Sequence, residues 1–379
     1  MKKRYYVLIG CLLLIVALYF TAAYSNISWI QKWRNIYIET ALNTLDHQWL
    51  ATALLPESVW KPVELRIQAA ESSQIGLKTE WPNGTPPQNN LARISDLDSF
   101  LSVFPETEPN SLRNVLQSNP HEFSAGWEAL QMYSDKGLGV FTIYGDELLC
   151  IDVPNRLIIL RMQNGNCTGA MAICADPYRL SLRASSKIGT SGETTAEYAA
   201  ASNAVLSIPA SAFDGANDGG NGGVLAGYAM CSGVEYGEHL SEGNKRLEIR
   251  NHVFYITDSI NPVQDDCQYA VEFRPALIVD GAICVDQSWA SLHPRVCIGQ
   301  TQSGNILMLV MEGRINGSAS LGASLPDCAS MLAKYNCQQA MNLDGGNSAM
   351  MWYNGMCVTK GSDPDHPEGR PVPTAFVYG

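Results

Sequence analysis

The chain has 379 residues, of which 46% are hydrophobic, and a formal net charge of -12 at pH 7. This length and apolar content allow a sizeable core, arranged as one large domain or two ordinary ones. Because binding to nucleic acid needs clustered cations and the sequence has no Lys/Arg-rich run, the composition argues against a nucleic-acid partner and favours a small or carbohydrate-like substrate.

Residues 1–27 predict a transmembrane anchor or signal segment. Three cations at positions 2–4 precede about twenty uncharged and mostly apolar residues, 5–24, which is enough for a helix that crosses a bilayer. Thr21-Ala22-Ala23 resembles a signal-peptidase site, so cleavage stays an alternative. The long apolar stretch favours an uncleaved single-pass anchor in the cell membrane, with a cytoplasmic N-terminus and an extracellular catalytic domain.

Residues 28–136 predict a helical stalk and linker region. Apolar and aromatic residues recur every three or four positions from 29 to 54, which predicts a helix that continues from the membrane until Pro56. The stretch 80–90 is dense in Pro, Asn and Gly and is typical of a linker or long surface loop. Short helical patterns follow around 96–104 and 112–116.

Residues 137–379 predict the catalytic domain, an α+β fold with a large mixed or antiparallel sheet and packed helices. Short runs rich in Val, Ile, Leu and Tyr are separated by Gly, Asn and Asp, as in strands and turns. Asp280-Gly281 between two apolar runs indicates a β-hairpin. One helix is well marked, because Ser324 can cap it and Pro326 suits its first turn.

The cysteines predict disulfide bonds. Ten follow Cys11, and none of them forms a CxxC pair, so a structural zinc site is disfavoured. An even number in a segment expected outside the cell fits an oxidising compartment. The alternative is a set of buried free thiols, since free Cys is among the most buried residue types.

The stretch "AMNLDGGNSAMMW" carries the first candidate site. Residues 340–343 read as a short buried strand, which places Asp344 at its carboxyl end and Gly345-Gly346 in a turn that glycine tolerates easily. Consecutive N–H groups in such a turn can bind an anion, and Asn347 and Ser348 add polar side chains. The alternative interpretation is an ordinary Asp-Gly turn.

Two further stretches end apolar runs with charged residues. The run 306–311 is followed by Glu312 and Arg314, which could form a surface pair or a carboxylate and a phosphate-binding guanidinium in one cleft. Arg295 follows His293-Pro294 into another apolar run. His293 by itself is more typical of a turn or core histidine than of a catalyst.

The order of these stretches resembles the phosphodiester glycosidase family, from roughly Ala170 to the end of the chain. "HPRVCIG" is similar to the family's His-Pro-Arg-Thr-x-x-Gly, "LVMEGR" to its apolar run ending Asp-Gly-Arg, "GASLPDCASMLAKYNCQQAMNLDGG" to its Gly-Ala-(Ser/Thr)-Leu helix and Asn-Leu-Asp-Gly-Gly-Gly-Ser, and "EGRPVPTAFVYG" to its closing Arg and strand. Three positions depart from the pattern: Glu312 replaces Asp, Asn347 replaces a third Gly, and Pro209 replaces the Asn that normally follows Ile.

The resemblance implies hydrolysis of the glycosidic bond in a sugar-1-phosphodiester, in exopolysaccharide or cell-wall glycan metabolism. A phosphate monoester is a good leaving group, so the enzyme must activate water or attack the anomeric carbon, stabilise oxocarbenium character and hold the phosphate charge. The hypothesis makes two carboxylates catalytic and assigns the other polar groups to the substrate. The catalytic pair is Asp344 and Glu312, and the substrate-binding set is Arg295, Arg314, His293, Gly345, Gly346, Asn347 and Ser348.

Two other functions stay open. One is a non-catalytic carbohydrate- or cell-wall-binding module on the same fold, which Pro209 and Asn347 favour. The other is a conventional glycoside hydrolase, which needs a protonated general acid in an apolar setting. No cofactor is required by the sequence, although a divalent cation is compatible with Asp214 and Asp218, whose spacing does not match an EF-hand.

Overall fold

A computed structural model describes residues 2–43, 48–81, 86–87, 91–119, 121, 123–214, 220–315 and 319–379. The chain divides into two compact units. The smaller unit comprises Met1–Ser73 and Gln287–Leu292, and the larger comprises Gln74–Asp286 and His293–Gly379. Of residues 28–136, expected to form a helical stalk and linker region, residues 74–136 therefore cluster with the larger unit.

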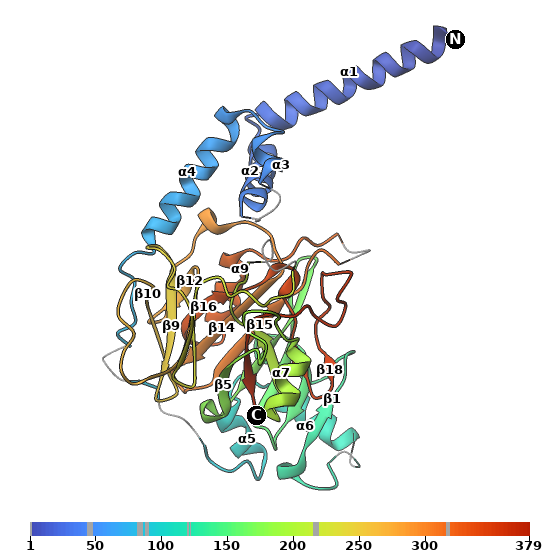
Figure 1. Ribbon diagram of the computed structural model, residues 1–379. Coiled ribbons are helices and arrows are strands. Elements are labelled where there is room, and N and C mark those ends of the chain that lie inside the picture. Colours follow the sequence, from blue (N-terminus) through green and yellow to red (C-terminus); the bar gives the residue numbers. More distant parts are fainter. Residues whose placement is uncertain are drawn as a thin grey trace. The chain divides into compact units, whose positions relative to one another are not determined.

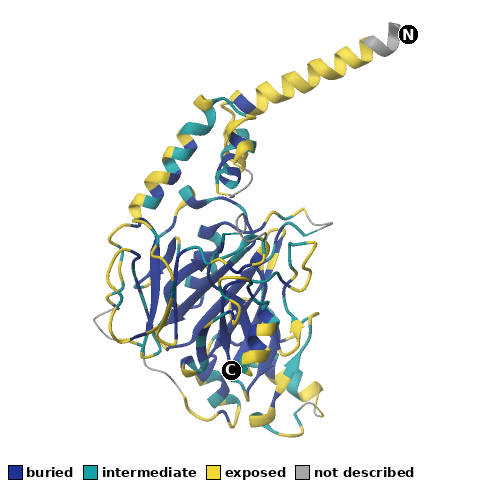
Figure 2. Cartoon of the chain, viewed as in Figure 1, coloured by how far each residue is buried: buried dark blue, intermediate teal, exposed yellow. Residues whose placement is uncertain are grey.

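The smaller unit is helical (Figure 1). Its helices are α1 Lys2–Tyr24, α2 Ser28–Leu42, α3 Trp49–Thr52 and α4 Glu57–Ser73. The segment Tyr6–Tyr24 of α1 has a mean hydropathy of 2.4 and is long and apolar enough to cross a membrane. By length and composition it fits a membrane anchor or a signal peptide. Figure 2 shows α1 as almost wholly exposed.

The expected single helix from the membrane to Pro56 is interrupted. The chain leaves the helical conformation at residues 25–27 and again between α2 and α3. Arg34 of α2 donates from Nη1 to the carbonyl oxygens of Ala23, at 2.8 Å, and Ser25, at 3.1 Å. These carbonyls lack helical partners at the end of α1, so Arg34 satisfies them and fixes the break.

Helix α4 lies within the predicted helical stalk and linker region but beyond Pro56, where the first predicted helix ends. Pro56 precedes the first turn of α4, and Pro62 lies inside the helix. An internal proline normally argues against a helix. Tertiary burial outweighs this cost, because Val63 and Ile67 of α4 join Ile38 and Ala51 in the core of the smaller unit.

The helices of the larger unit are α5 Leu97–Val103, α6 Pro109–Ser118, α7 Thr195–Ser202 and α9 Leu325–Lys334. The predicted helices near 96–104, 112–116 and 324–335 are thus confirmed. Ser324 and Asp327 form a reciprocal capping box at the start of α9, with a proline in its first turn.

The largest sheet has nine strands in the order β1-β2-β3-β4-β15-β14-β16-β12-β13. Asp280 and Gly281 have φ of +50° and +79° and join β12 to β13, as the hairpin signal predicts. The strands of this nine-stranded sheet are β1 Gln131–Tyr133, β2 Leu148–Asp152, β3 Leu157–Asn164, β4 Cys167–Cys174, β12 Ala276–Val279, β13 Ala282–Ile283, β14 Arg295–Thr301, β15 Ile306–Met311 and β16 Cys337–Leu343.

Two five-stranded sheets complete the larger unit, in the orders β10-β9-β11-β7-β8 and β18-β17-β6-β19-β5. Side chains from all three sheets share one buried cluster, seen as dark blue strands in Figure 2. The α+β class with large antiparallel sheets is therefore confirmed. The remaining strands are β5 Leu180–Ala184, β6 Leu206–Pro209, β7 Tyr228–Cys231, β8 Val234–Gly237, β9 Lys245–Arg250, β10 Val253–Asp258, β11 Cys267–Phe273, β17 Trp352–Tyr353, β18 Met356–Cys357 and β19 Thr374–Tyr378.

The expected linker 80–90 begins as packed structure. Trp81 is 3% exposed, and its ring nitrogen donates to the carbonyl oxygen of Phe254 at 3.2 Å. The backbone N–H groups of Glu80 and Trp81 donate to the Asp280 carboxylate, each at 2.9 Å. Residues 82–85 and 88–90 of this stretch lie outside the described residues.

The predicted disulfides are absent, because all eleven cysteines are free. Eight are buried, Cys284 and Cys357 are half-buried, and Cys11 is exposed. The buried thiols fill apolar positions on different strands and on α9, where each acts as a small hydrophobic side chain. The alternative of buried free thiols therefore describes the cysteines of this structure.

Candidate functional site

Three neighbouring strands present the predicted site residues at one edge of the nine-stranded sheet. Strands β15, β14 and β16 are adjacent, with Arg295 opposite Met311 and Val296 opposite Leu343. Glu312 follows Met311, and Asp344 follows Leu343. Because antiparallel neighbours alternate in direction, the ends of β15 and β16 lie beside the start of β14.

Close backbone contacts hold this edge together. A Cβ added to Gly345 would lie 2.5 Å from the carbonyl oxygen of Pro294, and one added to Gly322 would lie 2.0 Å from the carbonyl carbon of His293. A Cβ on Gly313 would lie 2.5 Å from the nitrogen of Gly322. These glycines are needed because the backbone segments approach more closely than any side chain allows.

Asp344 is the most strongly perturbed carboxyl group at this edge. Asp344 as a whole residue is partly exposed to solvent. Its Oδ2 atom, however, is buried and has no hydrogen-bond partner among the described residues. Burial raises its pKa to about 7, and the Ser348 hydroxyl and Arg370 guanidinium partly oppose that rise. A carboxyl group of this kind exists in both protonated and ionised forms near neutral pH.

Arg370 has no role in the sequence-based prediction beyond its place in the family's closing motif. It stands close enough to Asp344 to lower that group's pKa. One terminal nitrogen donates to the carbonyl oxygen of Gly220 at 3.1 Å, and its guanidinium lies over the Phe213 ring at 4.5 Å. Its Nε is buried without a partner among the described residues, which leaves a donor for an anionic ligand. Because the two residues are 26 positions apart in the chain, sequence inspection does not reveal this electrostatic effect.

Glu312 is held as a hydrogen-bond acceptor. Its carboxylate accepts from the Thr168 hydroxyl at 2.7 Å and from the backbone N–H of Lys360 at 2.8 Å. Ser362 lies two residues after Lys360, and its hydroxyl donates to the carbonyl oxygen of Gly346 at 3.2 Å. Since consecutive Cα atoms are about 3.8 Å apart, this short segment ties Glu312 to the turn that follows Asp344.

His293 and Arg314 form a pair on the same edge. The guanidinium of Arg314 contacts Nδ1 of His293, and Arg314 has a left-handed φ of +57°. Burial, Arg295 and Arg314 lower the pKa of His293 to about 2. Because a guanidinium only donates, Nδ1 must accept and the proton of the neutral ring lies on Nε2. Nε2 is buried without a partner among the described residues.

We expect His293 to stay neutral, with its proton on Nε2, from pH 5 to pH 8. Nitrogen-15 NMR of histidine-labelled protein measures this directly, and the His293→Gln spectrum assigns the signal. A His293 signal that titrates near pH 6.5 would contradict the structure. The low pKa also predicts that stability falls as pH drops below about 6.5, because only the unfolded chain then takes up the proton.

The glycine turn offers fewer anion-binding groups than its sequence suggests. The N–H of Gly346 donates to the carbonyl oxygen of Pro294 at 2.9 Å, and the N–H of Ser348 donates to that of Gly345 at 3.0 Å. Asn347 accepts from the Ser362 hydroxyl at 3.1 Å. The turn therefore fixes the edge of the sheet, and the guanidinium groups become the stronger candidates for holding phosphate.

A cation site has no support within the described part of the chain. No group of three or more His, Cys, Asp or Glu residues there is arranged to hold a metal ion. Asp214 is described, whereas Asp218 lies outside the described residues.

The structure thus groups the nine predicted residues into one region with three parts. Asp344 interacts with the Ser348 hydroxyl and with the charge of Arg370, His293 lies near Arg295 and Arg314, and Glu312 accepts a hydrogen bond from the segment that reaches the glycine turn. Arg295 is anchored through its Nε, which donates to the carbonyl oxygen of Ala323 at 3.2 Å. Among the described residues, the unpartnered atoms Asp344 Oδ2, Arg370 Nε and His293 Nε2 are what a polar ligand would satisfy.

Comparison with known proteins places this region in a recognised domain. Residues 202–378 match the family model for phosphodiester glycosidase. No curated protein matches the chain. All nine predicted residues and Arg370 lie inside the matched range.

Several solved structures are similar to the chain, and two of them are representative. One is the zebrafish N-acetylglucosamine-1-phosphodiester alpha-N-acetylglucosaminidase catalytic domain, auto-inhibited by its pro-peptide, with 17% identity, coverage of 59% of this chain and 81% of that chain, and a TM-score of 0.49. The other is a hypothetical protein from Synechocystis, with 13% identity, coverage of 61% of this chain and 63% of that chain, and a TM-score of 0.41.

Proposed function

We propose, from the premise that residues 202–378 belong to the phosphodiester glycosidase family, that this chain hydrolyses the glycosidic bond of a sugar-1-phosphodiester. Water supplies a hydroxyl group to the anomeric carbon, and the phosphate monoester leaves with its bridging oxygen. The observation that carries the proposal is the buried Oδ2 atom of Asp344, which has no hydrogen-bond partner among the described residues and feels the positive charge of Arg370.

The two carboxyl groups suit different tasks. Asp344 can hold or release a proton near neutral pH, because burial raises its pKa to about 7. Glu312 accepts two hydrogen bonds, from Thr168 and from the N–H of Lys360, which hold its carboxylate in place. We assign proton transfer to Asp344 and stabilisation of positive charge at the anomeric carbon to Glu312.

The leaving phosphate needs donors that do not change protonation state. Guanidinium groups meet this need, since they stay charged and can form two parallel bonds to phosphate oxygens. Arg370 is the first candidate because its Nε is unpartnered and its charge acts on Asp344. Arg295 and Arg314 remain proposed substrate ligands, and the neutral His293 offers an N–H donor to a sugar hydroxyl.

The proposed setting is the outer face of a cell membrane. The apolar segment of α1 would anchor the chain, and the positive residues before it would stay in the cytoplasm. Exopolysaccharide or cell-wall glycans carrying sugar-phosphodiester linkages are the proposed substrates. The same arrangement is compatible with a cleaved signal peptide, which N-terminal sequencing of the purified protein distinguishes.

The proposal predicts that the full chain in detergent releases free sugar from a UDP-sugar or another sugar-1-phosphodiester. Arg370→Gln should lower kcat/KM by about tenfold to a hundredfold, because it removes one charged phosphate ligand. Arg113→Gln, an exposed cation on α6, is the matched control and should have no effect. Saccharide binding without turnover would instead support the non-catalytic binding module.

A conventional glycoside hydrolase is a second candidate, because the raised pKa of Asp344 also suits a general acid that protonates a sugar leaving group. Aryl glycosides that carry no phosphate separate the two functions. Turnover of these substrates at a rate similar to that of the phosphodiester would favour the conventional enzyme. The positive charge of Arg370, which acts on Asp344, favours the phosphodiester.

A further inference from the structure

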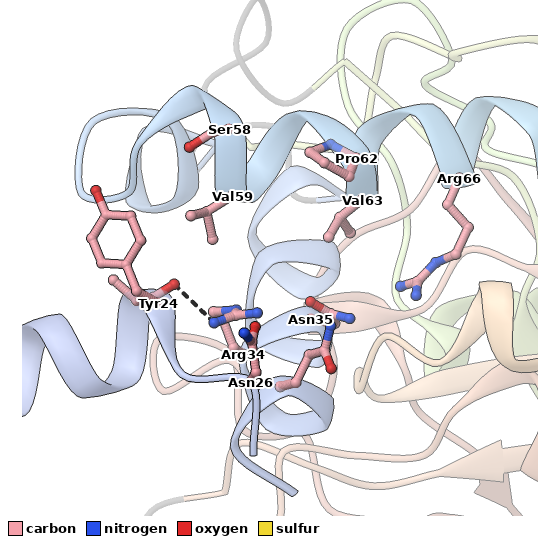
Figure 3. A pocket seen from close by; sticks show the side chains of 11 residues that line it. Tyr24, Asn26, Arg34, Asn35, Ser58, Val59, Pro62, Val63 and Arg66 are labelled. Carbon is pink, nitrogen blue, oxygen red and sulfur yellow. Dashed lines mark hydrogen bonds between the residues drawn. The ribbon is translucent and has the colours of Figure 1, made fainter. Parts of the chain in front are cut away.

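A second polar site lies in the smaller unit, where α1 ends. A pocket of about 330 Å³ opens between the end of α1 and helices α2 and α4. This volume falls at the lower end of small-molecule sites, which span roughly 300–1,000 Å³. Figure 3 shows that polar side chains of α2, including Arg34 and Asn35, face the residues that α4 contributes.

Two arginines give the pocket its chemical character. Arg34 uses Nη1 for the carbonyl oxygens at the end of α1, and Arg66 donates from Nη2 to Glu39 at 3.2 Å. The Nε atoms of both arginines are buried and have no hydrogen-bond partner among the described residues. Buried donors without partners cost free energy, so an acceptor that reaches them would stabilise this unit.

Neutral donors surround these cations. Asn26, Gln31, Asn35 and Ser58 also line the pocket, and their amide and hydroxyl groups can donate to oxygen. Glu39 pairs with Arg66 but is not among the lining residues. Guanidinium groups with amide and hydroxyl donors match the several oxygens of a phosphate group.

The surroundings of the pocket indicate where such a phosphate comes from. The Tyr19 hydroxyl, in the apolar segment of α1, donates to the carbonyl oxygen of Leu54 at 3.1 Å. Tyr19 lies about 7.5 Å before Tyr24 along the helix axis. The segment between α3 and α4, which contains Leu54, therefore lies beside the last turns of α1. Ser58, which lines the pocket, lies in the first turn of α4.

The exposed face of α2 fits the same location. Trp29, Trp33 and Tyr37, spaced four residues apart, are 64%, 55% and 42% exposed. Tryptophan and tyrosine concentrate at the level of lipid headgroups, where one side of the ring is apolar and the other is wet. Aqueous exposure of this stripe would carry a cost that a membrane interface removes.

We propose that this pocket binds the phosphate of an anionic membrane phospholipid. The phosphodiester accepts from the buried Nε atoms of Arg34 and Arg66, while the acyl chains lie along the apolar surface of α1. Bound lipid would hold α1, α2 and α4 in one arrangement. The inference goes beyond the proposed hydrolysis but rests on its membrane anchor, which cell fractionation tests separately.

Native mass spectrometry tests the proposal by measuring how much added lipid the full chain retains in mild detergent. The lipids added are phosphatidylglycerol and, separately, phosphatidylcholine. The wild-type protein should retain phosphatidylglycerol at least about tenfold better than the Arg34→Gln/Arg66→Gln variant, which lacks both charge-assisted donors. Lys32→Gln removes an exposed cation of α2 that does not line the pocket, and it should retain lipid as the wild type does.

A second variant covers the case in which the double variant misfolds. Ser58→Glu adds a negative charge to the pocket and leaves the bonds from Arg34 to α1 in place, so it should also reduce retention about tenfold. Equal retention in wild type and Ser58→Glu overturns the proposal. Displacement of the lipid by millimolar inorganic phosphate also overturns it, because the site would then take free phosphate. Unchanged sugar release in these variants separates this result from failure of the proposed hydrolysis.

Discussion

Asp344→Asn should reduce sugar release by about a hundredfold or more and should raise the stability of the larger unit at pH 8. The loss of activity follows because an amide neither gives nor takes a proton at the proposed step, and it removes a preorganised charge. The gain in stability follows from burial, which makes the ionised form of Asp344 costly. A purely structural Asp-Gly turn predicts no loss of activity.

The stability of the wild type depends on pH through Asp344. The pKa of Asp344 is about 7 in the folded chain and near its ordinary value of 3.8 in the unfolded chain. Between these values the folded chain holds the proton and the unfolded chain loses it. The wild type therefore loses stability as pH rises from about 4 to 7, by on the order of 4 kcal/mol in total.

Thermal unfolding followed by near-ultraviolet circular dichroism measures the difference in stability between Asp344→Asn and the wild type. The stability gap between Asp344→Asn and the wild type should be widest at pH 8 and should narrow toward pH 5. Asp265→Asn, in an exposed loop, is the control and should match the wild type at both pH values. A gap that stays constant with pH would show that Asp344 is not the titrating group.

Much of the fold follows from local patterns in the sequence. The run 306–311 becomes β15 with the same bounds, and the capping signals at Ser324 mark the start of α9. The Asp280-Gly281 turn is read correctly because both residues tolerate positive φ. These signals depend on residues close together in the chain, so neighbouring elements hardly change them.

Other features depend on contacts that local patterns do not encode. Helix α4 forms despite Pro62, because its burial against α2 compensates for the lost backbone bond. The cysteine count cannot distinguish disulfides from buried thiols, since both use the same residues. The charge of Arg370 acts on Asp344 although the two residues lie on different segments, and β19, which follows Arg370, pairs with β6.

The positions of the candidate site residues are predicted in part. The ends of two apolar runs correctly indicate where Asp344 and Glu312 lie, because strand ends meet at a sheet edge. The contact between Arg314 and His293 could not be read from the sequence, since it depends on a left-handed residue and on the close approach of Gly322. The glycine turn was expected to cradle an anion, and its hydrogen bonds instead join it to Pro294.

Gly322 should be among the least replaceable residues of the larger unit. A Cβ at this position would lie 2.0 Å from the carbonyl carbon of His293, and its φ of +117° disfavours any L-residue. Relief requires a shift of the backbone that carries His293 and leads into Arg295. Strain and overpacking together should cost about 3–5 kcal/mol in Gly322→Ala.

Gly355→Ala provides the matched control, because Gly355 has a φ of +90° but no atom within 4 Å of an added Cβ. It carries only the backbone cost, about 1–2 kcal/mol. Gly322→Ala should therefore have a Tm lower than that of Gly355→Ala by about 5–10 °C, and it should also lose the His293 Nε2 proton signal. Equal Tm values for the two variants would mean that the contact between residues 322 and 293 is looser than the structure has it, and the convergence of the three strand ends would lose its main support.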